Sequence, residues 1–159
     1  VIGAGDGQKA NWAYLGKQSG CGILVFWPPT TYLANVSGAV GGNNPKQWLQ
    51  DACHDLKNSP RGAKNLLREM RHGLSKDDGA HGEALETSIT YYENNLKRMD
   101  YARYGKLKYP IGSGVTEAAC KVMVKQRLCG SGMKWIIPNT ENMFLIRGLV
   151  LTEGRWGQF

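Results

Sequence analysis

Apolar residues follow two different periods along the first third of the chain. Residues 1–4 and 22–26 are short apolar runs bounded by turn-forming residues, a pattern typical of buried strands. Between them Trp12 and Leu15 stand three residues apart, which indicates a short helix over residues 11–18. Pro28 and Pro29 are expected to stop the second strand. The opening segment therefore predicts a strand, a helix and a second strand.

From residue 32 to residue 104 the apolar period becomes helical. The strongest stripe steps by four, three, four and three residues, which is the spacing of one helix face. Two weaker stripes precede it, on either side of Pro60, and residues 75–82 (SKDDGAHG) read as a loop between helices. The strong stripe consists of Leu85, Ile89, Tyr92, Leu96 and Met99.

The last part of the chain predicts two more helices. Pro110 biases its predecessor away from helix, and Ser113 is a suitable N-cap for a helix over about residues 114–129. Glycines at 130 and 132 would end it. Asn139 or Thr140 is expected to cap a final helix that runs to about residue 151.

Positive charge gathers at one end of the sequence. The chain of 159 residues has a net charge of +7. Residues 1–94 hold nine basic and nine acidic residues, whereas residues 95–159 hold eleven basic and four acidic ones. This concentration suits a polyanionic partner, although a solvated basic surface is the simpler alternative.

Cysteine spacing argues against a zinc protein, and hydropathy argues against a membrane protein. The four cysteines and three histidines form no zinc-binding spacing, so we expect free, mostly buried thiols in a reducing cytoplasm. No apolar run reaches the length of a membrane span, and no signal peptide is present, which predicts a cytoplasmic protein without a membrane partner. The sequence opens without Met inside a strand-like run, as a processed or truncated product would.

Two carboxylates are candidates for site chemistry. Glu117 would share a helix face with Lys121 and Lys125, either as a surface ion pair or as a metal-binding carboxylate beside lysines that meet phosphates. Asp6 lies between Gly5 and Gly7, where it is either a turn residue or a ligand that the glycines expose. The glycine run is not a dinucleotide fingerprint, because position 8 is Gln.

Longer motifs add a resemblance to a known family. Residues 109–135 read YPIGSGVTEAACKVMVKQRLCGSGMKW, and residues 147–156 read RGLVLTEGRW. With the GDG turn at residues 5–7, they closely resemble bacterial insertion-sequence DDE transposases of the ISKra type, which are related to the Mutator-like group. The resemblance covers essentially the whole chain.

The resemblance implies an α/β fold: a partial ribonuclease-H-like core with a helical insertion, helix-rich by residue count. Residues 1–31 would supply core strands and the GDG turn, residues 32–104 the insertion, and residues 105–159 the C-terminal core helices. Asp6 and Glu117 would be two of three catalytic carboxylates that hold Mg²⁺ or Mn²⁺. The family's first catalytic Asp belongs to an earlier strand, which this sequence does not include.

One stretch departs from the family pattern. After the strand the family carries Asp-Phe-Tyr-His, whereas here Phe26, Trp27, Pro28 and Pro29 follow, so both the Asp and the His are absent. With two of three carboxylates and without this motif, the chain alone is expected to bind metal weakly, if at all, and not to cut DNA.

The predicted function is therefore that of a DNA transposase fragment, from a family that cleaves and transfers DNA strands with metal. Lys121, Lys125, Arg127 and Lys134 are predicted DNA-backbone contacts, because an acid that must meet phosphates needs basic surroundings. The alternative is a non-catalytic DNA-binding or assembly fragment, which needs no metal. A homo-oligomer is left open.

Overall fold

The computed structural model describes residues 2–77 and 79–158. It opens with strand β1 (Ile2–Gly5), helix α1 (Lys9–Gln18) and strand β2 (Cys21–Leu24). The strands are parallel, in a register that pairs Ile2 with Cys21 and Gly5 with Leu24. The predicted strand–helix–strand order is confirmed, with α1 beginning two residues earlier than expected. Both strands end at the same edge of the sheet, where Asp6 follows β1.

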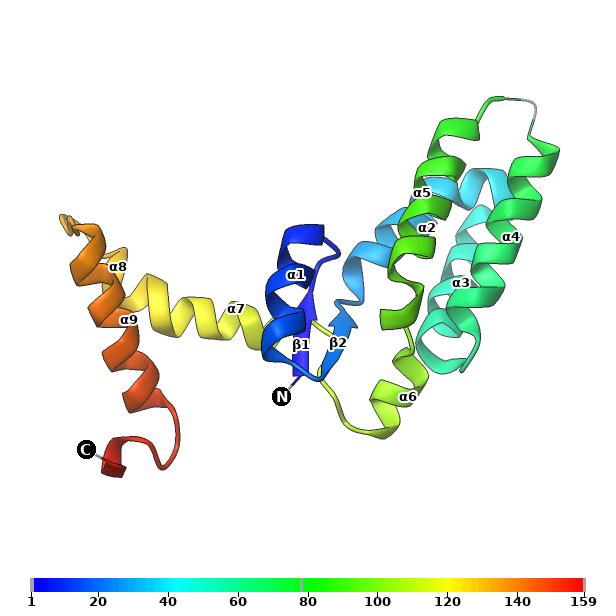
Figure 1. The fold of residues 1–159 in the computed structure, drawn as a ribbon. Helices are drawn as coiled ribbons and strands as arrows, with labels where there is room; N and C mark the ends of the chain where they lie inside the picture. The colour runs from blue at the N-terminus through cyan, green and yellow to red at the C-terminus, as the bar shows by residue number, and fades with distance from the viewer. Residues whose placement is uncertain (1, 78, 159) are drawn as a thin grey trace. The chain divides into compact units, whose positions relative to one another are not determined.

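The region predicted to be helical forms a helical bundle. Figure 1 shows α2, α3, α4 and α5 packed side by side. The first of these helices begins at Trp27, five residues before the expected start, because Pro28 and Pro29 lie in its first turn. A proline is well tolerated there, since the first N–H groups of a helix have no partner inside the helix. The helices are α2 (Trp27–Val40), α3 (Pro45–Asn58), α4 (Gly62–Lys76), α5 (Gly82–Asn95), η1 (Leu96–Arg98) and α6 (Tyr101–Lys106).

The predicted stripe along α5 is the core-facing side of that helix. Leu85 and Tyr92 are 0% exposed and Ile89 is 8% exposed. Full burial of a large apolar side chain contributes roughly 1.5–3 kcal/mol, so this face supplies much of the attraction between α5 and its neighbours. The Tyr92 hydroxyl donates to the Pro29 carbonyl oxygen at 3.1 Å, which joins the middle of α5 to the start of α2.

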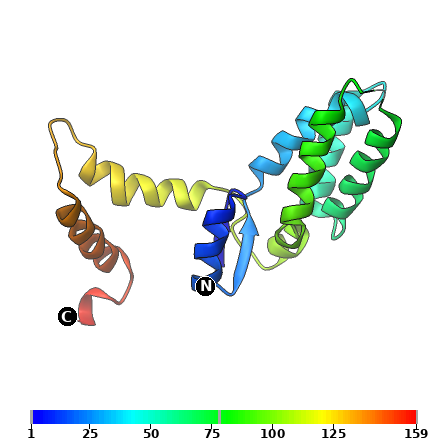
Figure 2. The same ribbon diagram turned by 45° about the horizontal axis from the view of Figure 1, so that its top comes forward.

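The chain divides into two compact units, residues 1–113 and residues 114–159. In the second unit, a loop joins the first helical run to α9, as Figure 2 shows, and α9 contacts that run at its π-helical segment. None of its described side chains is fully buried, and α9 exposes large apolar residues such as Ile137, Leu145 and Val150. Its elements are α7 (Gly114–Cys120), the π-helical segment η2 (Lys121–Lys125), α8 (Gln126–Leu128), α9 (Ile137–Leu151) and η3 (Trp156–Gln158).

The start of α9 differs from the prediction. The helix begins at Ile137 with Pro138 in its first turn, so Asn139 and Thr140 lie inside it rather than at its cap. The Thr140 hydroxyl instead donates to the Ile136 carbonyl oxygen at 3.2 Å. The preceding helical run does begin at Gly114, directly after Ser113, and ends at Leu128, close to the predicted 129.

The helix-rich composition is confirmed: 69% of the residues are helical and 5% lie in strands. All four cysteines are free, as expected. The expectation that they are mostly buried is wrong, because Cys120 and Cys129 are exposed and Cys21 and Cys53 are half-buried. Within residues 2–77 and 79–158, no helix combines the length and the apolar character needed to cross a membrane.

Candidate nucleic-acid and metal site

Asp6 occupies the turn between β1 and α1. Its side chain is exposed, and its Oδ1 accepts hydrogen bonds from the Gln8 amide and from Asn11 Nδ2, both at 3.1 Å. This geometry gives Asp6 the turn role that its residue type favours. Both hydrogen bonds end on one oxygen of the carboxylate, so the turn role does not occupy Oδ2.

Gly7 and Tyr91 fix the backbone around this aspartate. Gly7 has φ of +102°, a conformation that glycine adopts at little cost and that produces the sharp turn predicted for it. The Tyr91 hydroxyl donates to the Asp6 carbonyl oxygen at 3.2 Å, and its ring stacks on Tyr32 with centroids 4.0 Å apart. Burial raises the pKa of Tyr91, and Tyr32 and Asp6 raise it further, so the hydroxyl stays a neutral donor. No signal in the sequence pointed to Tyr91, which lies 85 residues from Asp6.

Glu117 lies where the sequence predicted, on an exposed helix face in the second unit. Glu117, Lys121 and Lys125 line one shallow pocket, together with Cys120 and Gln126. The predicted shared face of these three charged residues is therefore present. A carboxylate beside two ammonium groups suits either an ion pair or a cation site that phosphates approach.

The helix changes its winding at this pocket. Residues Lys121–Lys125 form a π-helical turn, which the sequence did not predict. Nη2 of Arg147, on α9, donates to the Val122 carbonyl oxygen at 2.6 Å, so a side chain from the other helix binds the altered backbone. Single π turns inside α-helices occur frequently at functional sites.

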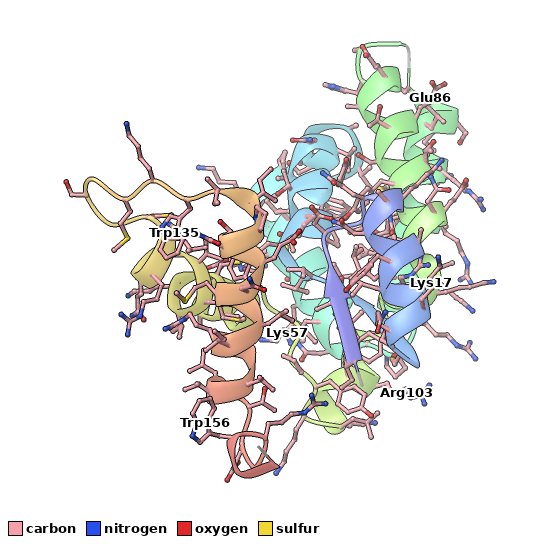
Figure 3. All side chains as sticks on the ribbon, turned by 60° about the vertical axis from the view of Figure 1, so that its left-hand side comes forward. Lys17, Lys57, Glu86, Arg103, Trp135 and Trp156 are labelled. Carbon is pink, nitrogen blue, oxygen red and sulfur yellow. The ribbon has the colours of Figure 1, made fainter. Side chains whose placement is uncertain are left out.

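The other two predicted DNA contacts lie outside this pocket. Arg127 is exposed on α8 and is not among the lining residues. Lys134 lines a separate pocket after α8, with Met133, Trp135 and Ile136. Figure 3 labels Trp135 and Trp156, which flank α9. The structure thus places Lys121 and Lys125 in one pocket with Glu117, whereas Arg127 and Lys134 lie outside that pocket.

The two predicted metal ligands belong to different units, Asp6 to the first and Glu117 to the second. Their meeting in space stays a prediction. Among the described residues, no group of three or more His, Cys, Asp or Glu side chains could hold a metal ion. Each carboxylate is exposed and of the type that hard divalent cations prefer, so the donor chemistry fits Mg²⁺ or Mn²⁺ at either residue.

Residues 26–29, where the resemblance led us to expect a different motif, are packed at Phe26 and Pro29, whereas Trp27 is 67% exposed. The Phe26 amide donates to the Ile111 carbonyl oxygen at 2.8 Å, and the Phe26 ring meets Tyr101 edge-on, with centroids 5.2 Å apart. Pro29 is buried and accepts the hydrogen bond of Tyr92. Phe26 and Pro29 therefore stabilise the packing of the first unit, and none of residues 26–29 has a side-chain oxygen or imidazole to offer a metal.

The chain matches no family model, no curated protein and no solved structure.

Proposed function

We propose that the chain is the C-terminal part of a DNA transposase, with Glu117 and the basic residues around it facing DNA. The observation that carries this proposal is the pocket that Glu117, Lys121 and Lys125 line together. One carboxylate among cations, in the region that carries the net charge of the chain, suits a phosphate-bearing substrate.

The arrangement around Asp6 supports the same proposal. Ligands of open sheets with parallel strands bind beyond the carboxyl ends of those strands, which is where the β1–α1 turn presents Asp6. A parallel strand–helix–strand unit also suits part of a ribonuclease-H-like core, with the helical bundle as its insertion. Asp6 and Glu117 would then be the residues that hold divalent metal.

When bound, such a metal would supply electrostatic stabilisation of the attacking and leaving oxygens in phosphoryl transfer. The residues of this chain would bind and orient the DNA. Lys121 and Lys125 would contact backbone phosphates, while Tyr91 and Gly7 hold the Asp6 turn in place. We expect the chain alone not to cut DNA, because it offers two of the family's three carboxylates.

The DNA interface can be tested through the salt dependence of duplex binding. Replacing Lys121 and Lys125 with Ala should lower the slope of log affinity against log salt by one to two units, at roughly 0.9 per phosphate contact. The matched control replaces Lys9 and Lys17 with Ala; these residues lie on α1, are exposed and carry the same charge, and Figure 3 labels Lys17. Equal slopes for the two double variants would show that the lysines on the Glu117 face do not contact DNA.

A different measurement tests the hypothesis that Asp6 and Glu117 hold one metal ion. Mn²⁺ broadens NMR signals of amides near its binding site, so substoichiometric Mn²⁺ should broaden the amides of both Gly7 and Glu117. Glu117→Gln should then reduce the broadening at Gly7, because one ligand of the shared ion is lost. Broadening at Gly7 that is unchanged in this variant would show that the two carboxylates do not share an ion.

The alternative is a non-catalytic DNA-binding or assembly fragment, which does not require the metal-binding group of three side chains that is missing among the described residues. It predicts the same salt dependence without any Mn²⁺ effect at Gly7. A plasmid-nicking assay with Mg²⁺ or Mn²⁺ gives an independent comparison. Cleavage by the parent chain that Glu117→Gln abolishes would contradict both the alternative and the expected inactivity.

A further inference from the structure

A second basic pocket lies in the first unit, at the start of β2. Gly20 and Gly22 line it from the strand side, Lys97 and Arg98 from η1, and Arg103 and Tyr104 from α6. Gly20 and Gly22 lie at the amino end of β2, whereas Asp6 follows the carboxyl end of β1, so pocket and aspartate belong to opposite ends of the parallel pair. Figure 3 labels Arg103 on α6. The pocket has three cationic side chains and no carboxylate among its lining residues.

Arg98 is held in place by its surroundings. Its guanidinium carbon lies 4.4 Å from the centre of the Trp12 ring, a distance typical of a cation–π contact. A side chain at position 22 would crowd this pair, because a Cβ there would lie 3.3 Å from Trp12 Cζ3 and 3.5 Å from Arg98 Nε. Glycine therefore leaves the room that Arg98 uses, and the guanidinium is ordered before any ligand arrives.

The backbone adds a donor to the pocket. The Val25 amide donates to the Gly5 carbonyl oxygen on β1, whereas the Phe26 amide donates to Ile111 on the other side of β2. Since amides alternate in direction along a strand, the amide of Gly22 points to the same side as that of Phe26, away from β1. Gly22 lines the pocket, so an anion there can accept from its amide as well as from the cations.

The cations of this pocket form no ion pair with a neighbouring acid among the described residues. Asp100 is the one acidic residue between Lys97 and Lys108, and it caps α6 by accepting from the Arg103 amide at 3.3 Å. Lys97, Arg98 and Arg103 form no ion pair with any carboxylate in the described parts of the chain. Three cations without a described ion-pair partner, around a backbone amide and beside one carboxylate, are a suitable environment for an anion with two negative charges.

We propose that this pocket binds a phosphate group, presented either by a nucleic-acid backbone or as free phosphate. The assignment rests on the charge and the donors of the pocket and does not depend on strand cleavage at Asp6 or Glu117. Its residues also differ from the predicted DNA contacts, which all lie in the second unit.

The test uses the full chain with Lys97 and Arg103 replaced by Gln. Both side chains are exposed, and Arg98 stays on Trp12, so the variant keeps the contact that orders the pocket. The matched control replaces Lys57 and Lys64 with Gln; they are exposed on α3 and α4, carry the same charge and lie outside the pocket. Far-UV circular dichroism checks that both variants keep their helix content.

Two titrations distinguish the sources of the phosphate. With inorganic phosphate, the Gly22 amide resonance should shift and saturate in the parent and in the control, and should not shift in K97Q/R103Q. With duplex DNA, K97Q/R103Q should lower the slope of log affinity against log salt by roughly two units, at 0.9 per contact, and the control should leave it unchanged.

A loss in both titrations assigns the pocket to backbone phosphate, and a loss with inorganic phosphate alone assigns it to a small phosphate ligand. If the Gly22 resonance does not respond to phosphate and the salt slopes of the two double variants agree, the proposal is wrong. The slope of the Lys121 and Lys125 variant is measured separately, so failure of one interface is distinguishable from failure of the other.

Discussion

Gly7 offers a direct test of how the Asp6 turn is held. We consider Gly7→Ala, with Gly79→Ala as a matched control in the loop between α4 and α5. Both glycines belong to the first unit and have almost the same φ, +102° at Gly7 and +101° at Gly79. A Cβ at position 79 meets open space, whereas a Cβ at position 7 would lie 3.0 Å from the Tyr91 hydroxyl oxygen and 3.1 Å from Cε2.

The expected costs differ because Tyr91 cannot move freely. An L side chain in this region of φ costs about 1–2 kcal/mol, and both variants lose that much. At position 7 the Tyr91 ring must also shift against Tyr32, which weakens the hydrogen bond to the Asp6 carbonyl and removes about 1 kcal/mol more. We expect Gly7→Ala to lower the free energy of unfolding by about 2–3 kcal/mol and Gly79→Ala by about 1–2 kcal/mol.

Urea unfolding followed by ellipticity at 222 nm measures both values. A further variant isolates the cause: Tyr91→Phe removes the hydroxyl, so Gly7→Ala in that background should cost about 1 kcal/mol less than in the parent. If Gly7→Ala is no more destabilising than Gly79→Ala, Tyr91 does not restrain the turn, and our account of how Asp6 is positioned fails.

Two further predictions concern the core of the first unit and the π-helical segment of the second. Burial raises the pKa of Tyr92 above its ordinary value of 10.0, so the unfolded chain loses the hydroxyl proton at a lower pH than the folded chain does. The contribution of the buried hydroxyl to the free energy of unfolding is therefore complete below pH 10 and decreases as the pH rises above 10. Tyr92→Phe should cost about 0.5–1.5 kcal/mol at neutral pH by removing the hydrogen bond to the Pro29 carbonyl. It should also flatten the decline between pH 10 and 11 by about 1 kcal/mol in urea titrations, and an unchanged decline would exclude Tyr92 as its source. Arg147→Gln should remove the hydrogen bond to Val122 and speed amide exchange in Lys121–Lys125 about fivefold, which corresponds to a loss of about 1 kcal/mol. Arg155→Gln, at an exposed position, is the control and should leave these exchange rates unchanged. Equal rates in the two variants would show that Arg147 does not stabilise this segment.

Local patterns predicted most of the secondary structure but not the features that depend on distant partners. The stripe from Leu85 to Tyr92 predicted α5 because burial follows the helical period. The early starts of α2 and α9 were missed because prolines that normally end elements lie in the first turns of both helices. The π-helical segment could not be predicted, since Arg147, 25 residues along the chain, binds its Val122 carbonyl.

The candidate site shows the same difference between features set by local sequence and features set by distant partners. The shared face of Glu117, Lys121 and Lys125 was visible in the sequence because it depends on spacing along one helix. The part that Tyr91 plays at Asp6 was not visible, because α5 reaches β1 only through the packing of the first unit. The phosphate pocket was also missed: in the sequence Lys97 and Arg103 are only two of the eleven basic residues over 95–159, and the fold alone places them beside Gly22.

The division into two units has a consequence for cooperativity. The second unit has no fully buried side chain among those described, so it has little free energy with which to resist unfolding by itself. Equilibrium melting of the whole chain should then show two transitions rather than one, and a single midpoint would average them. The five tryptophans offer a way to separate the transitions, since Trp12, Trp27 and Trp48 belong to the first unit and Trp135 and Trp156 to the second. Replacing the last two with Phe would leave a fluorescence signal that reports on the first unit alone.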